Sequence, residues 1–356
     1  MERISADSFK RIPSETEIRK KDPQGPTQKE LKMTTYLVTG GAGFIGSHIV
    51  HRLVSRREAQ EERGETPDTI RVLDDFSTGF ERNISPYLAA FEIELFDGSL
   101  TDPEIVRQAV DGAEVIFHEA ALASVPLSVE HPMRVHDACV TGTVQLLDAA
   151  RQAGVRRVVY AASSSAYGNT EVCPTPESVL PAPISPYGAS KLAAELYLQA
   201  FAETYGLETV RLRYFNVFGP RQDPKSPYSA VIPLFISAML RGEAPNIFGD
   251  GRQSRDFTYV ENVVDANILA SEAPAENVSG RVFNIANGKS SDLLTLISTL
   301  NEILGTQITP NHLPPRVGDI LESRADISAA RKFLGYEPRM DLAEGLRRTV
   351  EFYRQG

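Results

Sequence analysis

Short apolar runs alternate with longer helical stretches along most of the chain. Helical periodicity is clearest in the intervals 132–153 and 186–205. Because near-continuous apolar strands that alternate with helices are typical of a parallel sheet covered on both faces, we predict a doubly wound α/β fold. The predicted strands are Thr34–Thr39, Ile70–Leu73, Val115–His118, Val155–Ala161 and Thr209–Tyr214.

The stretch from 186 to 205 carries helix-boundary signals at both ends. Ser185 can cap the helix, Pro186 suits its first turn, and Gly206 can end it in a left-handed conformation. These signals predict one helix over Pro186–Tyr205.

Both ends of the chain depart from the strand–helix pattern. Residues 1–33 mix charges with prolines and show no sustained periodicity, which predicts a mobile tail. Alternatively, they are an upstream extension with the original start near Met33. After Asn216, loops rich in Pro and Gly alternate with short helices, and a late strand at Arg281–Ala286 is expected to rejoin the main sheet. The predicted division is a main domain over 34–215 with the crossing segment 256–287, and a smaller mixed α/β lobe over 216–255 and 288–356.

Composition and charge limit the classes of binding partner that the chain is expected to have. The chain has 37 basic and 47 acidic residues and a net charge of −10, which argues against a nucleic-acid or anionic-membrane partner. Its two cysteines, Cys139 and Cys173, offer no disulfide or metal framework, so no metal site is expected and a reducing cytosol fits. No apolar run could span a bilayer, and no signal-peptide pattern is present. We therefore predict a cytoplasmic protein.

A glycine-rich loop follows the first predicted strand. Gly40, Gly43 and Gly46 are spaced G-x-x-G-x-x-G between that strand and a helix that starts near Phe44. Glycines there permit a tight turn and close approach of a pyrophosphate, and the helix N-terminus offers free N–H groups to phosphate. The loop predicts a Rossmann-type dinucleotide site.

Acidic residues end the next two strands. A carboxylate at Asp74–Asp75 can accept hydrogen bonds from the adenosine ribose and repel a 2′-phosphate, which favours NAD over NADP. The gap between Gly46 and Asp74 is longer than usual, and the polar segment 56–68 accounts for it as a surface insertion. Asp97–Gly98, after a third strand, is placed to meet the adenine.

Tyr187 and Lys191 lie four residues apart and therefore share one helix face. Ser163–Ser165 close the strand before this helix, at the sheet edge where ligands bind. A free phenol, with a pKa of about 10, is a poor base at neutral pH. An ammonium roughly 4 Å away contributes on the order of 4 kcal/mol at an effective dielectric of about 20. We therefore expect Lys191 to lower the Tyr187 pKa enough for base catalysis of hydride transfer.

These motifs together resemble the extended short-chain dehydrogenases/reductases, and within them the UDP-sugar 4-epimerase branch. The resemblance covers about residues 35–355. The segments that carry it are TGGAGFIGSH, LDDFSTG, FHEAALASVP, AASSSAYG, SPYGASK, RYFNVFGPRQDP, GDGRQSRDFTYV and RVGD.

The resemblance implies a role for each matching residue. Tyr187 would be the base, Lys191 would bind the nicotinamide ribose, Ser163 would hold the sugar 4-hydroxyl, and Phe215 would lie against the nicotinamide. The implied cofactor is NAD, and its expected binding residues are Gly40, Gly43, Phe44, Ile45, Gly46, Asp74, Asp75, Ser77, Gly79, Asp97, Gly98, Ala120, Ala121, Tyr187, Lys191 and Phe215. The expected substrate-binding residues are Ser124, Ser163, Ser165, Tyr187, Asn216, Val231, Ile232, Arg255, Arg316, Asp319 and Ser323.

The resemblance also favours one reaction over others. Related dehydratases and decarboxylases carry acidic residues beside the active-site hydroxyl, whereas Ser163 is followed by two serines. This leaves 4-epimerisation of a UDP-hexose, in which hydride leaves C4 and returns to the other face. The small Ser323 over the sugar predicts that UDP-GlcNAc and UDP-GalNAc are accepted, together with UDP-Glc and UDP-Gal.

Two departures and several alternatives remain open. Cys139 stands where the family usually has Asn, which predicts slower turnover, and Glu119 stands where neutral residues are commoner. Arg324 keeps a UDP-glucuronate 4-epimerase in view. A net nucleotide-sugar oxidoreductase or dehydratase and a non-catalytic NAD-sensing regulator are further alternatives. Relatives dimerise through helices such as 132–153 and 186–205, so a homodimer is expected.

Overall fold

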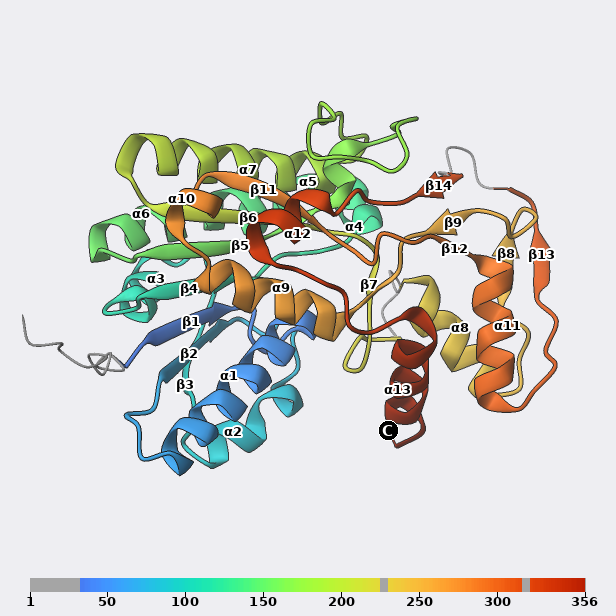
Figure 1. The fold of residues 1–356 in the computed structure, drawn as a ribbon, viewed down its shortest axis with the longest axis horizontal. Helices are drawn as coiled ribbons and strands as arrows, with labels where there is room; N and C mark the ends of the chain where they lie inside the picture. Colours follow the sequence, from blue (N-terminus) through green and yellow to red (C-terminus); the bar gives the residue numbers. More distant parts are fainter. Residues whose placement is uncertain (1–32, 225–229, 316–320, 356) are drawn as a thin grey trace, which may run out of the picture. The chain divides into compact units, whose positions relative to one another are not determined.

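The structure is a computed structural model and describes residues 33–224, 230–315 and 321–355. In this part of the chain, a seven-stranded sheet has the order β11-β6-β5-β4-β1-β2-β3, with all neighbouring strands parallel (Figure 1). The predicted doubly wound fold is confirmed. The strands are β1 Thr35–Thr39, β2 Thr69–Asp74, β3 Glu94–Asp97, β4 Val115–His118, β5 Arg157–Ser163, β6 Glu208–Tyr214 and β11 Arg281–Ile285.

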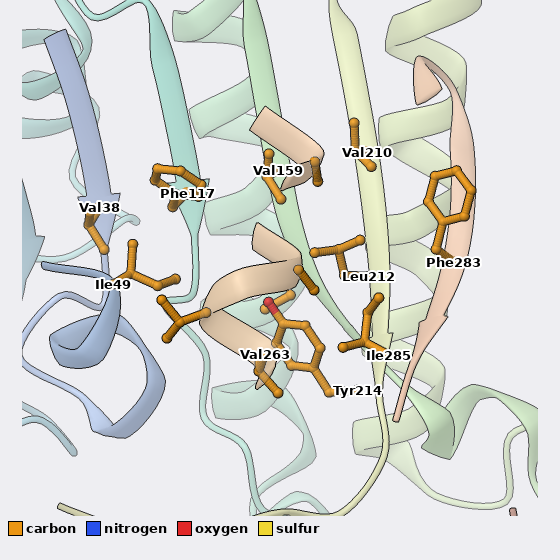
Figure 2. Close-up of a cluster of buried hydrophobic side chains, with 14 of the residues drawn as sticks. Val38, Ile49, Phe117, Val159, Val210, Leu212, Tyr214, Val263, Phe283 and Ile285 are labelled. Carbon is orange, nitrogen blue, oxygen red and sulfur yellow. The ribbon is translucent and has the colours of Figure 1, made fainter. Parts of the chain in front are cut away.

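Helices cover both faces of this sheet because successive strand residues point to opposite sides. On one face, Val38, Phe117 and Val159 from neighbouring strands pack with Ile49 of α1 and Val263 of α9 (Figure 2). On the other face, Leu37 and its neighbours are buried with the second helical layer. The helices of the first layer are α1 Phe44–Glu62, α9 Val260–Glu272 and α12 Ser328–Leu334, and those of the second are α3 Pro103–Val110, α6 Gly142–Ala153 and α7 Pro186–Tyr205.

Helix α7 has the predicted bounds. The Ser185 Oγ accepts a hydrogen bond of 3.1 Å from the Gly188 N–H, and Gly206 adopts a φ of 70° at the C-terminal end. The expected strand Val155–Ala161 begins later, at Arg157, because the Val155 N–H still closes α6 on the Ala150 carbonyl.

The helical stretch predicted over 132–153 is confirmed in its bounds, and it contains a π-helical turn that the pattern did not predict. It consists of α5 Pro132–His136, the π-helical turn Asp137–Thr141, and α6. The Thr143 hydroxyl donates to the Cys139 carbonyl oxygen at 2.7 Å within this turn. Such turns frequently occur at functional sites, and this one carries Cys139.

The late strand rejoins the main sheet as predicted. β11 pairs with β6 along its whole length, from Arg281 opposite Val210 to Ile285 opposite Tyr214. The chain therefore leaves the main sheet after β6 and returns to its edge. The proposed domain boundaries remain a prediction.

The remaining elements form a smaller lobe with its own buried cluster, which includes Phe235, Ile236, Leu296 and Leu346. Its helices are α8 Val231–Leu240, α11 Leu293–Leu304 and α13 Leu342–Gln355. Its strand groups are β12–β9–β14 (Ser291–Asp292, Ser254–Arg255, Glu322–Ser323), β13–β8 (Asn311–Leu313, Asn246–Phe248) and β10–β7 (Thr258–Tyr259, Val217–Phe218). Within the described ranges, no helix is both long and apolar enough to cross a membrane.

Candidate active site

A cavity of about 690 Å³ opens at the carboxyl ends of β1, β2, β4 and β5. Its size is within the range usual for small-molecule sites. The predicted cofactor-binding residues that line it are Gly40, Gly43, Phe44, Ile45, Gly46, Asp74, Asp75, Ser77, Gly79, Gly98, Ala120, Ala121, Tyr187 and Lys191.

The glycine loop forms one wall by close packing of backbone on backbone. A Cβ on Gly46 would lie 2.1 Å from the Gly40 carbonyl oxygen, and one on Gly40 would lie 2.7 Å from the Ala120 backbone. Helix α1 begins after Gly43 with no side-chain cap and no acidic residue in its first turn. Its first N–H groups are thus left for an anion at the cavity wall, and the arrangement fits the pyrophosphate of a dinucleotide.

Asp74 fastens this loop to the end of β2. Its Oδ2 accepts from the Ala42 N–H at 2.8 Å and its Oδ1 from the Phe76 N–H at 2.9 Å, while burial raises the pKa of its carboxyl. Each oxygen keeps a lone pair, so the carboxylate can still accept from a ribose hydroxyl. Asp75, by contrast, accepts from the Ser77 N–H at 2.9 Å.

Two predicted cofactor-binding residues do not line the cavity. Asp97 ends β3 in register with Asp74, and its side chain is exposed. Phe215 is 2% exposed and packs in the core with its ring centroid 6.2 Å from that of Tyr167. The Phe215 side chain fills the sheet core, and its contact with the nicotinamide stays a prediction.

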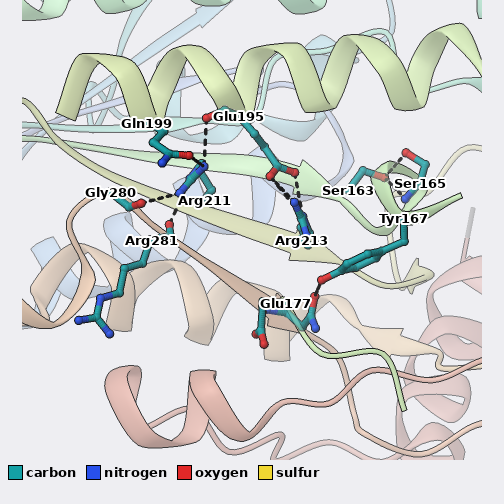
Figure 3. A network of polar contacts seen from close by, with 11 residues as sticks. Ser163, Ser165, Tyr167, Glu177, Glu195, Gln199, Arg211, Arg213, Gly280 and Arg281 are labelled. Atoms are coloured by element: carbon teal, nitrogen blue, oxygen red, sulfur yellow. Dashed lines mark hydrogen bonds and ion pairs between the residues drawn. The ribbon is translucent and has the colours of Figure 1, made fainter. Parts of the chain in front are cut away.

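Tyr187 and Lys191 lie one turn apart on α7, and both line the cavity. The Ser163 Oγ, at the end of β5, accepts from the Ser165 N–H at 3.2 Å and from the Ser165 hydroxyl at 2.8 Å (Figure 3). Burial raises the pKa of the Tyr187 phenol, and the nearby Ser163 hydroxyl opposes this rise. Because the Ser163 oxygen already accepts from Ser165, its own proton is available to the Tyr187 oxygen, which favours the phenolate.

The expected lowering of the Tyr187 pKa is wrong for this arrangement. Burial raises the pKa of Tyr187, the nearby Cys139 adds to the rise, and only the Ser163 hydrogen bond opposes them. Lys191 does not offset the burial, because its Nζ donates to the Ala161 carbonyl at 2.8 Å and lies 4.8 Å from the centroid of the Tyr160 ring.

The cavity also has walls that the motifs did not assign. Glu119 directly follows β4, Tyr214 is the last residue of β6, and Arg221 comes from the segment after β7. Arg221 adopts a φ of 67° and donates from Nη1 to the Ser47 carbonyl at 2.9 Å. These three residues lie within the FHEAA, RYFN and FGPRQ segments, and that position was the sequence signal by which they could have been assigned to the site.

The predicted substrate-binding residues are only partly brought together. Ser124 lines the cavity and caps α4, Val125–Glu130, by accepting from the Leu127 N–H at 3.1 Å. Ser323 lies directly beside Arg255 in the β14–β9 pair. Val231 and Ile232 begin α8, next to the lining residue Ala230, and Asn216 donates to the Asp256 carbonyl at 3.3 Å. Arg316 and Asp319 lie outside the described residues.

Comparisons with known proteins agree with this fold and site. Residues 36–286 match the model of the NAD dependent epimerase/dehydratase family. A UDP-glucose 4-epimerase of Mycolicibacterium smegmatis is 38% identical over 89% of this chain and 98% of its own. The structure of a Thermotoga maritima UDP-glucose 4-epimerase with UDP-glucose matches with TM-score 0.81, at 40% identity over 90% of this chain and 99% of that one.

A UDP-N-acetylglucosamine 4-epimerase from Methanobrevibacter ruminantium, in complex with UDP-N-acetylmuramic acid, matches with TM-score 0.83. It is 40% identical over 91% of this chain and 99% of that one. The chain therefore belongs to the NAD-dependent epimerase/dehydratase family, in the UDP-glucose/UDP-N-acetylglucosamine 4-epimerase branch that its motifs predicted.

Proposed function

We propose that this protein interconverts the C4 epimers of a UDP-hexose: UDP-GlcNAc with UDP-GalNAc, and UDP-Glc with UDP-Gal. The observation that carries the proposal is the series of neighbouring hydroxyl groups Ser165, Ser163 and Tyr187, of which Tyr187 lines the same cavity as Lys191. The series contains hydroxyl groups and no carboxyl, so it suits proton transfer from an alcohol and offers no acid to expel a leaving group.

NAD, when bound, supplies the hydride acceptor and donor. The Tyr187 oxygen takes the proton of the sugar 4-hydroxyl and later returns it, with Ser163 stabilising the phenolate by donating to it. Lys191 lends positive charge to the same space from one turn along α7. Burial alone keeps Tyr187 protonated, so the phenol becomes a base only when further positive charge is near it.

We assign cofactor selection to Asp74 and Asp75, whose carboxylates at the cavity wall oppose a 2′-phosphate. We assign the grip on UDP to Asn216, Arg255, Val231 and Ile232, together with Arg316 and Asp319, and the sugar contacts to Ser124, Ser163, Ser165 and Ser323. A guanidinium is well suited to a diphosphate because it forms paired, charge-assisted hydrogen bonds.

A product assay tests the reaction directly. Purified protein given UDP-GlcNAc is expected to yield UDP-GalNAc, to approach the same mixture from either side, and to release no NADH, since the chemistry is redox-neutral. Chromatography of the nucleotide sugars and absorbance at the NADH band would measure both. Net NADH formation, or a dehydrated product, would instead establish an oxidoreductase or a dehydratase.

The small side chain at Ser323 is expected to set the sugar size. Ser323→Tyr should lower kcat/KM for UDP-GlcNAc by about 100-fold, since overfilling a packed site costs about 3 kcal/mol. Its kcat/KM for UDP-Glc should stay within a few-fold of wild type. Ser323→Ala is the matched control and should accept both sugars. Unchanged UDP-GlcNAc turnover in Ser323→Tyr would remove Ser323 from the sugar site.

Glucuronate is disfavoured as the sugar. Its carboxylate would need a cation near Ser323, and Arg324 is the candidate. The Arg324 Nε lies 3.7 Å from the Glu322 Oε1, so a carboxylate already stands beside this cation. For this reason we propose a neutral hexose, with glucuronate as the second candidate.

We also propose that the protein is a cytoplasmic homodimer. Met133 on α5 and Leu196 and Tyr197 on α7 are exposed apolar side chains on helices that pack together. A second copy of the chain would cover them. The free cysteines Cys139 and Cys173 are compatible with a reducing compartment.

A further inference from the structure

Glu119 is a carboxyl group in the cavity wall that the proposed reaction does not use. Its Oε1 accepts from the Tyr214 hydroxyl at 2.9 Å. The Tyr214 oxygen in turn accepts from the Asn267 Nδ2 at 2.8 Å, and this amide also donates to the Val263 carbonyl at 2.9 Å. The phenol proton must therefore point at Glu119, which holds this carboxyl as an acceptor.

Lys191, in contrast, is a buried cation that requires a nearby negative charge to stay protonated. Its side chain is 3% exposed, and no described carboxylate lies within ion-pair distance of its ammonium. Burial lowers the pKa of Lys191, while Cys139, Glu119 and Glu195 raise it. A buried ammonium without a nearby negative charge loses its proton, so the amine depends on these neighbours.

Of the two carboxylates near Lys191, Glu195 is already neutralised. It forms a two-pronged ion pair with Arg213, with 3.0 Å from Nε to Oε1 and 2.8 Å from Nη2 to Oε2, and both side chains are buried (Figure 3). Cys139 carries a charge only as a thiolate. Glu119 is the carboxylate left to balance the Lys191 charge.

We propose that Glu119 is a positioning residue whose carboxylate, fixed by Tyr214, is the counter-charge that keeps the buried Lys191 amine protonated. This proposal rests on the role given to Lys191 in the proposed function. It also gives one physical reason for the unusual Glu119. This residue follows His118, which lies opposite Tyr160, at the sheet edge where the Lys191 Nζ donates to the neighbouring Ala161 carbonyl at 2.8 Å.

The titratable groups that face Glu119 are few. They are Lys191 from α7, Tyr214 from β6 and Tyr160 from β5. The preceding residue, His118, is neutral, since burial lowers its pKa to about 3. Burial raises the pKa of Glu119 itself to about 7, against the Tyr214 hydrogen bond and Lys191. The counter-charge is therefore present above neutral pH, and it opposes the lowering of the Lys191 pKa that burial causes.

The test is an NMR titration of Lys191 in protein labelled at lysine Cε, with no sugar substrate present. The chain has nine lysines, and Lys191→Arg assigns the resonance. In Glu119→Gln, which keeps an acceptor for Tyr214, the Lys191 pKa is expected to fall by about 1 to 3 pH units. The alkaline limb of the kcat–pH profile should move by the same amount toward lower pH.

Two variants serve as controls. Glu114→Gln removes the same charge at the other end of β4, where Glu114 pairs with Arg156 at 3.4 Å, and should leave the Lys191 pKa unchanged. Glu119→Asp keeps the charge and should hold that pKa within about half a pH unit of wild type.

An unchanged Lys191 pKa in Glu119→Gln overturns the proposal. If this variant does not fold, Tyr214→Phe replaces it. Losing the donor makes Glu119 harder to ionise, so the Lys191 pKa should again fall, and an unchanged value would overturn the proposal as well. Because the titration needs no turnover, its failure leaves the epimerase proposal standing, and a failed product assay leaves the titration valid.

Discussion

Tyr187→Phe is expected to lower kcat by about 10²–10⁴-fold, the range that general acid–base catalysis contributes. The change removes one oxygen that accepts from Ser163 and leaves the ring among Leu122, Val135 and Cys139 in place. The fold, the melting temperature and NAD affinity should therefore change little. Steady-state turnover of UDP-GlcNAc would measure the loss of kcat, and calorimetric titration with NAD would measure the cofactor affinity.

A matched control lies on the same helix. Tyr205→Phe, at the far end of α7, removes a hydroxyl from an exposed ring that contacts Phe201 and Arg151, and should leave turnover unchanged. A non-catalytic NAD sensor would keep its function in Tyr187→Phe. Turnover within threefold of wild type in that variant would rule out Tyr187 as the base.

Gly46→Ala is expected to weaken NAD binding by at least about 100-fold. Its Cβ would lie 2.1 Å from the Gly40 carbonyl oxygen and 2.8 Å from the Gly40 carbonyl carbon. Backbone cannot rotate away as a side chain can, so the start of α1 must move. Overpacking of this kind costs about 3 kcal/mol, equivalent to about 100-fold in affinity. Fluorescence or calorimetric titration with NAD would measure the change.

A substitution at a second glycine, Gly305, serves as a control that distinguishes a loss of NAD binding from a loss of overall stability. Gly305 ends α11 with a φ of 69°, and a Cβ there would meet nothing within 4 Å. Gly305→Ala should cost about 1 kcal/mol of unfolding free energy from backbone strain alone. Its NAD affinity should match wild type. An equal loss of NAD affinity in both variants would mean that Gly46→Ala acts by unfolding the protein.

The main sheet and α7 follow from local sequence. Apolar runs such as Val115–His118 are buried on both faces, and Ser185 and Gly206 are local signals that need no tertiary contact. The π-helical turn at Asp137–Thr141 is different. A Cβ on the adjacent Gly142 would lie 2.8 Å from the Leu100 side chain, so the path of the chain there depends on packing against a distant segment.

The candidate site also contains features that local sequence predicts and features that depend on tertiary packing. The glycine loop and the Tyr187–Lys191 pair are visible because each is a local spacing. The rise in the Tyr187 pKa was missed because burial is set by the tertiary environment. The contact of Glu119 with Tyr214 joins residues 95 positions apart, which no single motif reveals.

The edge position of β11 fixes when the sheet can be completed during synthesis. β6 ends at Tyr214, and β11 begins 67 residues later at Arg281. At about 5–20 residues per second, the ribosome needs roughly 3–13 s to add them, with one edge of β6 unpaired meanwhile. An open strand edge readily pairs with other chains. The nascent protein therefore needs protection at β6 until Arg211 can bind the Gly280 and Arg281 carbonyls of the arriving strand.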